Sequence, residues 1–199
     1  PFSAYNDYTE KAFELILALA APAIENAVPP LFAELAAELD SDGSYRGYEE
    51  FHTFLSRELE SAESTGVDFA LMLLEVVNLD EVAYPGREDQ VAAELNEQLA
   101  SLIFDRTGGV SALFQYRERN QLSVLLPALH TSDFAHLSRQ IVEAVSDRAW
   151  SADGEAVFPE ILISYATASE SDYAVQPLIA HVERLLDRQS RQYRSLSHE

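Results

Sequence analysis

The chain has 199 residues, a formal net charge of -21 at pH 7 and one lysine, Lys11. A field of that sign repels phosphate backbones, so we expect no nucleic-acid partner. The absence of cysteine excludes disulfides, thiolate nucleophiles and cysteine-ligated zinc. The acidic, lysine-poor composition is also what adaptation of a whole proteome to high salt produces, and on that interpretation the charge says nothing about partners.

Hydrophobic residues make up 47% of the chain, which indicates a folded protein with a core. No window approaches the roughly 18 uninterrupted apolar residues of a membrane span, and no basic n-region precedes an apolar run. We therefore expect no membrane insertion in this segment and a cytoplasmic location. Because the first residue is Pro1 rather than methionine, we expect a piece of a longer chain.

Between residues 7 and 27 apolar residues recur at spacings of three and four, which predicts an amphipathic helix. Pro29 and Pro30 end this pattern, and Pro30 can open a second short helix. The stretch DSDGSYRG, residues 40–47, predicts a loop that separates a helical arm, residues 1–39, from the rest. The apolar stripe of this arm needs a partner surface, so we expect a homodimer formed through the N-terminal helices.

The stretch DFALMLLEVVNL, residues 68–79, is a nearly continuous apolar run, typical of a strand buried on both faces. Around it we expect helices over 48–64, 88–104, 132–148 and 172–189, hairpin strands over 110–116 and 122–126, and a strand over 160–167. This order predicts an α+β fold of the split βαβ kind, in which helices cover one face of a central, mostly antiparallel sheet. The predicted hairpin turn is polar and lacks glycine, although tight turns usually recruit one.

Several stretches resemble the GGDEF domain of diguanylate cyclases, in the same order and at nearly the same spacing. DSDGSYRGYEEF, residues 40–51, is similar to the loop that opens the family's first helix, and LLEVVNLDEV, residues 73–82, takes the place of its Asp-Ile-Asp-x-Phe-Lys strand end. ILISYATAS and LIAHVERLLDRQSR are similar to the family's closing strand and helix. Aligning SVLLP, residues 123–127, puts the Gly-Gly-Asp/Glu-Glu-Phe signature on ERNQL.

The resemblance covers residues 40–192, which implies a helical arm at 1–39, a GGDEF-like domain at 40–192 and a tail at 193–199. In the arm, FELILALAAPAIENA resembles the last helix of a GAF sensory domain. The implied setting is a bacterial signalling protein whose partners are an upstream sensory domain or another signalling protein.

In an active cyclase, carboxylates hold two metal ions that polarise the triphosphate of GTP. By the resemblance, Glu75 stands at the first ligand position. The signature positions fall on Glu118, Arg119, Asn120, Gln121 and Leu122. Asn120 thus replaces the second ligand by a neutral amide, and Gln121 replaces the glutamate that assists the chemistry. Glu118 and Arg119 replace two glycines whose lack of a Cβ lets the nucleotide approach the backbone.

Other family positions also differ. Val77 replaces the second strand aspartate, Asp80 a phosphate-contacting lysine, Ala83 the guanine-reading asparagine and Ser190 the lysine of the last helix. The inhibitory product site would need arginine and aspartate where Gly109 and Ala112 stand. Asp89 retains a possible vestigial contact with the nucleotide, and the alternative is a first-turn acidic residue favoured by the helix dipole.

The sequence thus predicts a degenerate, catalytically inactive GGDEF-like domain, with no catalytic residue, metal or cofactor, that acts through protein contact or dimerisation. One alternative is a non-catalytic module that binds GTP or cyclic di-GMP, with Arg117 or Arg119 on phosphate. The other is an active diguanylate cyclase that uses unfamiliar ligands such as Glu75.

Overall fold

The computed structural model describes residues 45–109, 111–127 and 131–197. The helical arm predicted for residues 1–39, and with it the dimer expected through that arm, lies outside the described residues. Within the described part, none of the helices combines the length and the apolar character needed to cross a membrane.

The centre of the fold is strand β1, Phe69–Val76, of which seven of eight residues are buried. It pairs antiparallel with β3, Gln121–Pro127, on one side and with β6, Ile161–Thr167, on the other. Strand β2, Ala112–Gln115, pairs antiparallel with β3, which gives the sheet order β2-β3-β1-β6. The predicted continuous apolar strand and the α+β fold with an antiparallel sheet are confirmed.

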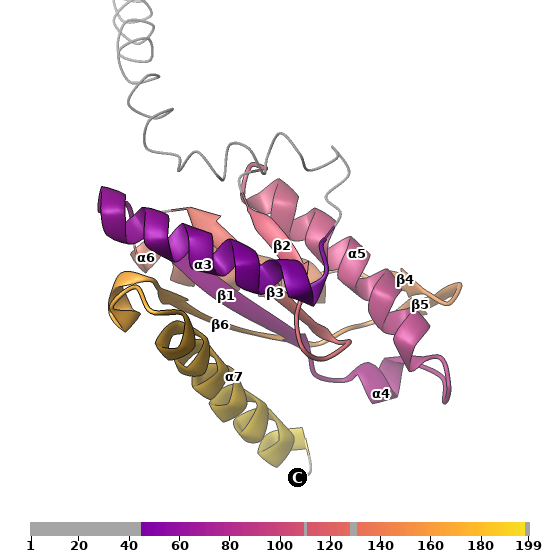
Figure 1. Ribbon diagram of the computed structural model, residues 1–199. Coiled ribbons are helices and arrows are strands. Elements are labelled where there is room, and N and C mark those ends of the chain that lie inside the picture. Colours follow the sequence, from indigo (N-terminus) through magenta and orange to yellow (C-terminus); the bar gives the residue numbers. More distant parts are fainter. Residues whose placement is uncertain (1–44, 110, 128–130, 198–199) are drawn as a thin grey trace, which may run out of the picture.

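Helices cover both faces of this sheet, whereas the sequence analysis expected them on one face. Helices α5, Glu88–Arg106, and α6, Thr131–Ser146, pack on the face that carries Met72 and Leu74. Helices α3, Tyr48–Thr65, and α7, Val175–Ser197, pack on the face that carries Leu71 and Leu73 and lie on the near side in Figure 1. Successive side chains of a strand point to opposite faces, so an apolar run without polar alternation needs cover on both.

The described part of the structure also contains four short elements that the sequence analysis did not predict. Helix α4, Leu79–Val82, comes directly after β1, and the 3-10 helix η1, Ser169–Ser171, precedes α7. Strands β4, Trp150–Ala152, and β5, Glu155–Val157, form a separate hairpin. Asp153 and Gly154 connect them with φ of 50° and 78°. An Asp-Gly pair with two positive φ angles is a strong hairpin signal, so this element was open to prediction.

The sequence also placed the end of the last helix too early, because α7 continues to Ser197.

Backbone hydrogen bonds of Arg46 hold the start of α3 against the hairpin. The Arg46 N–H donates to the Leu113 carbonyl over 3.0 Å, and the Gln115 N–H donates to the Arg46 carbonyl over 2.6 Å. These bonds cover part of the otherwise unpaired edge of β2.

The inner face of α3 buries one carboxylate among apolar residues. Glu58 is 1% exposed, and neither of its side-chain oxygens has a hydrogen-bond partner. Burial raises the pKa of Glu58 to about 7, and neighbouring Arg57 opposes the shift only partly. Because the charged form is disfavoured by desolvation, this residue costs stability whenever it is ionised in the folded state.

Replacing Glu58 by glutamine should therefore stabilise the fold in a pH-dependent way. The folded-state pKa lies above the unfolded one, so the cost is small at and below about pH 4.5 and grows as the pH rises through 7. Chemical unfolding should show E58Q gaining about 2 kcal/mol more at pH 8 than at pH 5. Glu60→Gln, at an exposed position of the same helix, should show no such dependence. Equal effects of E58Q at both pH values would contradict this assignment.

Candidate functional site

The polar turn between β2 and β3 is closed by its own side chains and backbone. The Gln121 N–H donates to the Glu118 carbonyl over 3.0 Å, and the Tyr116 N–H donates to the Gln121 carbonyl over 3.0 Å. The side-chain amide of Gln115 donates to the same two carbonyls, over 2.7 Å and 3.0 Å. No residue from 116 to 121 has a positive φ, which explains why the turn needs no glycine.

Asn120 fastens the turn to the end of the central strand. The Val76 N–H donates to the Asn120 carbonyl over 2.9 Å, and Asn120 Nδ2 donates to the Val76 carbonyl over 2.8 Å. These two bonds extend the β1-β3 pairing by one residue pair, in which the Asn120 side chain supplies one of the two donors. At the second metal-ligand position of the resemblance, the side-chain N–H of Asn120 is thus bonded to the protein's own backbone.

A second amide, Asn96, supports the turn from α5. Asn96 is fully buried, and its Nδ2 donates to the Arg119 carbonyl over 2.8 Å and to Gln115 Oε1 over 3.2 Å. The sequence analysis missed this residue. A signal was available, because Asn96 is the polar residue among the buried positions of an otherwise apolar helix face.

Arg119 and Asp89 join the tip of the turn to the first turn of α5. Arg119 Nη1 lies 2.7 Å from Asp89 Oδ1, and both side chains are largely in contact with water, with exposed fractions of 46% and 87%. The hydrogen bond to Asp89 raises the pKa of Arg119, and the charges of Asp89, Glu88 and Asp80 add to it. Asp89 therefore lies in the first turn of α5, as the sequence predicts, and pairs with Arg119 of the hairpin turn.

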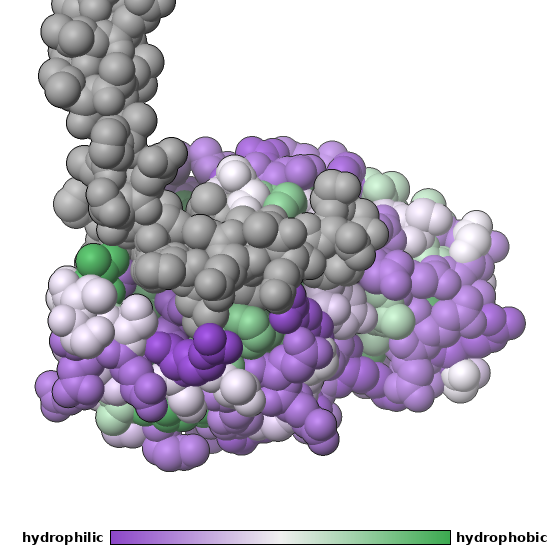
Figure 2. Space-filling view, turned by 45° about the horizontal axis from the view of Figure 1, so that its top comes forward, coloured by the Kyte–Doolittle hydropathy of each residue, from purple (hydrophilic) through white to green (hydrophobic). Residues whose placement is uncertain are grey.

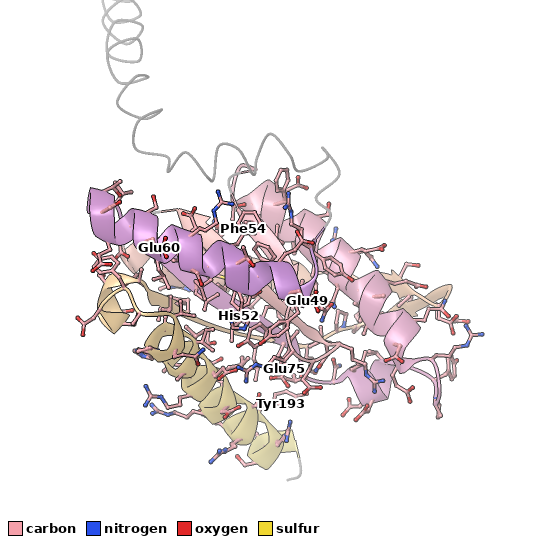
Figure 3. All side chains as sticks on the ribbon, in the orientation of Figure 1. Glu49, His52, Phe54, Glu60, Glu75 and Tyr193 are labelled. Carbon is pink, nitrogen blue, oxygen red and sulfur yellow. The ribbon has the colours of Figure 1, made fainter. Side chains whose placement is uncertain are left out.

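Three other positions of the resemblance, Glu75, Gln121 and Ser190, lie together on the face of the sheet that α3 and α7 cover. Glu75 and Gln121 face each other across β1 and β3, so their side chains lie on the same side of the sheet. Ser190 of α7 donates from its hydroxyl to Glu75 Oε2 over 3.1 Å. Figure 3 shows Glu75 between the end of the sheet and the C-terminal part of α7. Leu122, the last signature position, is fully buried in the core.

Arg117 joins the turn to α3 and α7. Its Nη1 lies 2.8 Å from Glu183 Oε1, and its Nε donates to the Tyr48 hydroxyl over 3.1 Å. The Tyr116 hydroxyl donates to the same Glu183 oxygen over 2.9 Å. Burial, and then the bond to Glu183, raise the pKa of Tyr116, which keeps this hydroxyl a neutral donor. A hollow of about 250 Å³ lies beside this network, between the turn and α7.

Solved structures identify the fold. The GGDEF domain of FimX from Pseudomonas aeruginosa matches with a TM-score of 0.64 at 15% identity, covering 77% of this chain and 93% of that one. The active GGEEF domain of a diguanylate cyclase from Vibrio cholerae matches with a TM-score of 0.61 at 12% identity, covering 75% and 93%. The chain has the GGDEF fold.

A further structure with the GGDEF fold is the coiled coil and GGDEF domain of DgcB from Caulobacter crescentus, determined in complex with c-di-GMP. It matches with a TM-score of 0.61 at 18% identity and covers 91% of this chain and 95% of that one. No protein-family model and no curated protein matches the sequence. At these identities the similarity establishes the fold alone.

The donor groups at the metal positions of the GGDEF resemblance do not fit a pair of magnesium ions. Mg²⁺ favours carboxylate oxygens, and a two-metal site needs several of them in one place. Glu75 supplies one carboxylate, while Asn120 donates its amide N–H to Val76. Within the described residues, no group of three or more His, Asp or Glu side chains is arranged to hold a metal ion.

Two substitutions in the turn should separate its structural from its surface interactions. Asn120→Ala removes the side-chain bond to the Val76 carbonyl, a partly buried acceptor, and should destabilise the fold by about 1–3 kcal/mol. Arg119→Ala removes an exposed ion pair and should cost less than about 1 kcal/mol. Chemical unfolding of both variants measures this contrast. The assignment is wrong if the arginine variant is the more destabilised of the two.

Proposed function

We propose that this chain is a GGDEF-fold domain of cyclic di-GMP signalling that lacks cyclase activity and acts through contact with other proteins. The observation that supports this most strongly is the bond from Asn120 to the Val76 carbonyl, 2.8 Å long, at the position where a cyclase would hold a metal ligand. A neutral amide offers a cation no charge, and the bond from Nδ2 fixes the Asn120 side chain against the end of β1.

The rest of the turn supports the same conclusion. Glu118 and Arg119 carry side chains at positions where the resemblance requires glycine for close approach of GTP. Gln121, opposite Glu75, has no acidic group that could accept a proton. Loss of these groups removes both the charge stabilisation and the proton transfer on which phosphoryl chemistry depends.

Nucleotide binding without turnover is the second candidate function. Arg117 supports it, because its side chain is 49% exposed and lines the hollow of about 250 Å³ beside Gln121. The same side chain is already paired with Glu183 and Tyr48, and Glu118 and Asp187 also line the hollow. A phosphate would have to displace Glu183 and sit among the remaining carboxylates, so we place this function second.

In this proposal the helical arm at residues 1–39 couples the domain to an upstream, GAF-like sensory unit and to a second copy of the chain. The fold keeps its two-sided core although the turn has changed, as expected for a domain retained as a contact surface in the bacterial cytoplasm. The degenerate turn would then serve stability, by joining α3, α5 and α7 to the sheet.

The purified chain should form no cyclic di-GMP from GTP with either Mg²⁺ or Mn²⁺. Chromatography of the nucleotides after prolonged incubation measures this, with an active diguanylate cyclase as the positive control. Product that disappears in the Glu75→Ala variant would overturn the proposal in favour of an active enzyme.

Calorimetric titration with GTP and with cyclic di-GMP separates the two non-catalytic functions. We expect no heat above dilution and no shift of the melting temperature with either nucleotide. Saturable binding that is weakened at least tenfold by Arg117→Ala, but not by Arg119→Ala, would establish the nucleotide-binding function instead.

A further inference from the structure

Two neighbouring hollows lie away from the hairpin turn, around the segment that joins β5 to β6. The larger has a volume of about 530 Å³ and is formed by residues 78 and 81–84 together with residues 155–158 and 160. The second, of about 370 Å³, has a mainly apolar lining. Phe158 and Glu160 line both hollows, so this segment lies between them.

Exposed aromatic residues gather at the larger hollow. Among the described residues, the large hydrophobic side chains that remain exposed are Tyr84, Phe158 and Leu196, and the first two line this hollow with exposed fractions of 63% and 65%. The face seen in Figure 2 is dominated by hydrophilic residues, with small apolar patches. On such a surface, two exposed aromatic residues around one depression mark a contact site.

The backbone holds Phe158 firmly in this exposed position. Asn78 is 7% exposed, its Nδ2 donates to the Phe158 carbonyl over 3.1 Å, and its Oδ1 accepts from the Glu160 N–H over 2.8 Å. The Val77 N–H donates to the Glu160 carbonyl over 2.9 Å, and Pro159 restricts the residue between. The backbone that carries the ring is therefore fixed before a partner binds, which lowers the conformational entropy lost on binding.

The charge around the aromatic pair determines which partner fits. Glu81, Glu155 and Glu160 line the larger hollow, and none of the three forms an ion pair within the described part of the chain. Carboxylates beside aromatic rings attract arginine and lysine, whose cations also bind over the ring faces. An acidic or neutral segment would have to desolvate these carboxylates without compensation.

The acidic character of the chain disfavours its own N-terminal segment or a second copy as the occupant. Residues 1–44 contain eight acidic residues against Lys11, and a second copy carries the same net charge of -21. Either would bring like charge to an acidic depression, which costs free energy. We therefore propose that the surface around Tyr84 and Phe158 is a docking site for a different protein, through a segment that places an apolar side chain beside arginine or lysine. This inference goes beyond the proposed function and does not depend on the chemistry of the hairpin turn.

Nuclear magnetic resonance titration of the ¹⁵N-labelled chain tests the proposal with two synthetic peptides, Ac-GRKLWKRG-amide and Ac-GEDLWDEG-amide. The basic peptide should produce saturable amide shifts at residues 81–84 and 155–160 and bind at least tenfold more tightly than the acidic one at low salt. Its affinity should fall as salt is added. Equal binding of the two peptides, no binding of either, or shifts centred outside these residues would overturn the proposal.

Substitutions of the two aromatic residues test whether they form the contact with the basic peptide. Phe158→Ser and Tyr84→Ser should each weaken the basic peptide at least fivefold, whereas Leu196→Ser, equally exposed and outside both hollows, should leave it unchanged. Glu155→Gln should reduce the salt dependence of binding. Circular dichroism verifies that each variant is folded. Sedimentation in which Phe158→Ser abolishes self-association would identify a second copy as the occupant and contradict the proposal.

Discussion

The structure depends on one strand that must be kept from water on both faces. Strand β1 buries seven of its eight residues, so it requires a neighbouring strand on each side and helices above and below. Burying each large apolar side chain contributes about 1.5–3 kcal/mol, which makes this strand the main source of cohesion between the two helical layers. The one residue of the strand that is not fully buried is Glu75, at the end where the hairpin turn lies.

Several polar groups at that end bond to one another within the protein. Asn120 and Val76 exchange two hydrogen bonds, Asn96 holds the Arg119 carbonyl, and Ser190 reaches Glu75 from α7. In a cyclase the same end of the sheet has to leave carboxylates and backbone open for metal ions and a nucleotide. Here the turn joins the sheet to its helices, and the exposed aromatic pair Tyr84 and Phe158 lies at a separate hollow.

The sequence was informative where a single physical pattern dominated. The apolar run of β1 and the spacing of apolar residues in α3 and α5 predicted these elements closely, and the family resemblance brought Glu75, Gln121 and Ser190 to one place in the fold. Helices on both faces were missed although the two-sided strand required them. The bonds of Asn120, Asn96 and Arg117 could not be predicted, because each joins residues that only the tertiary fold brings together.

The central claim is that the hairpin turn uses Asn120 and its backbone N–H groups for the fold rather than for metal ions and a nucleotide. Hydrogen exchange at the amides of Val76 and Gln121, measured with and without GTP and Mg²⁺, tests it most directly. Both amides donate within the turn, so they should be protected from exchange, and the nucleotide should leave their rates unchanged. Rapid exchange in the free protein, or protection that rises when GTP and Mg²⁺ are added, would contradict the claim.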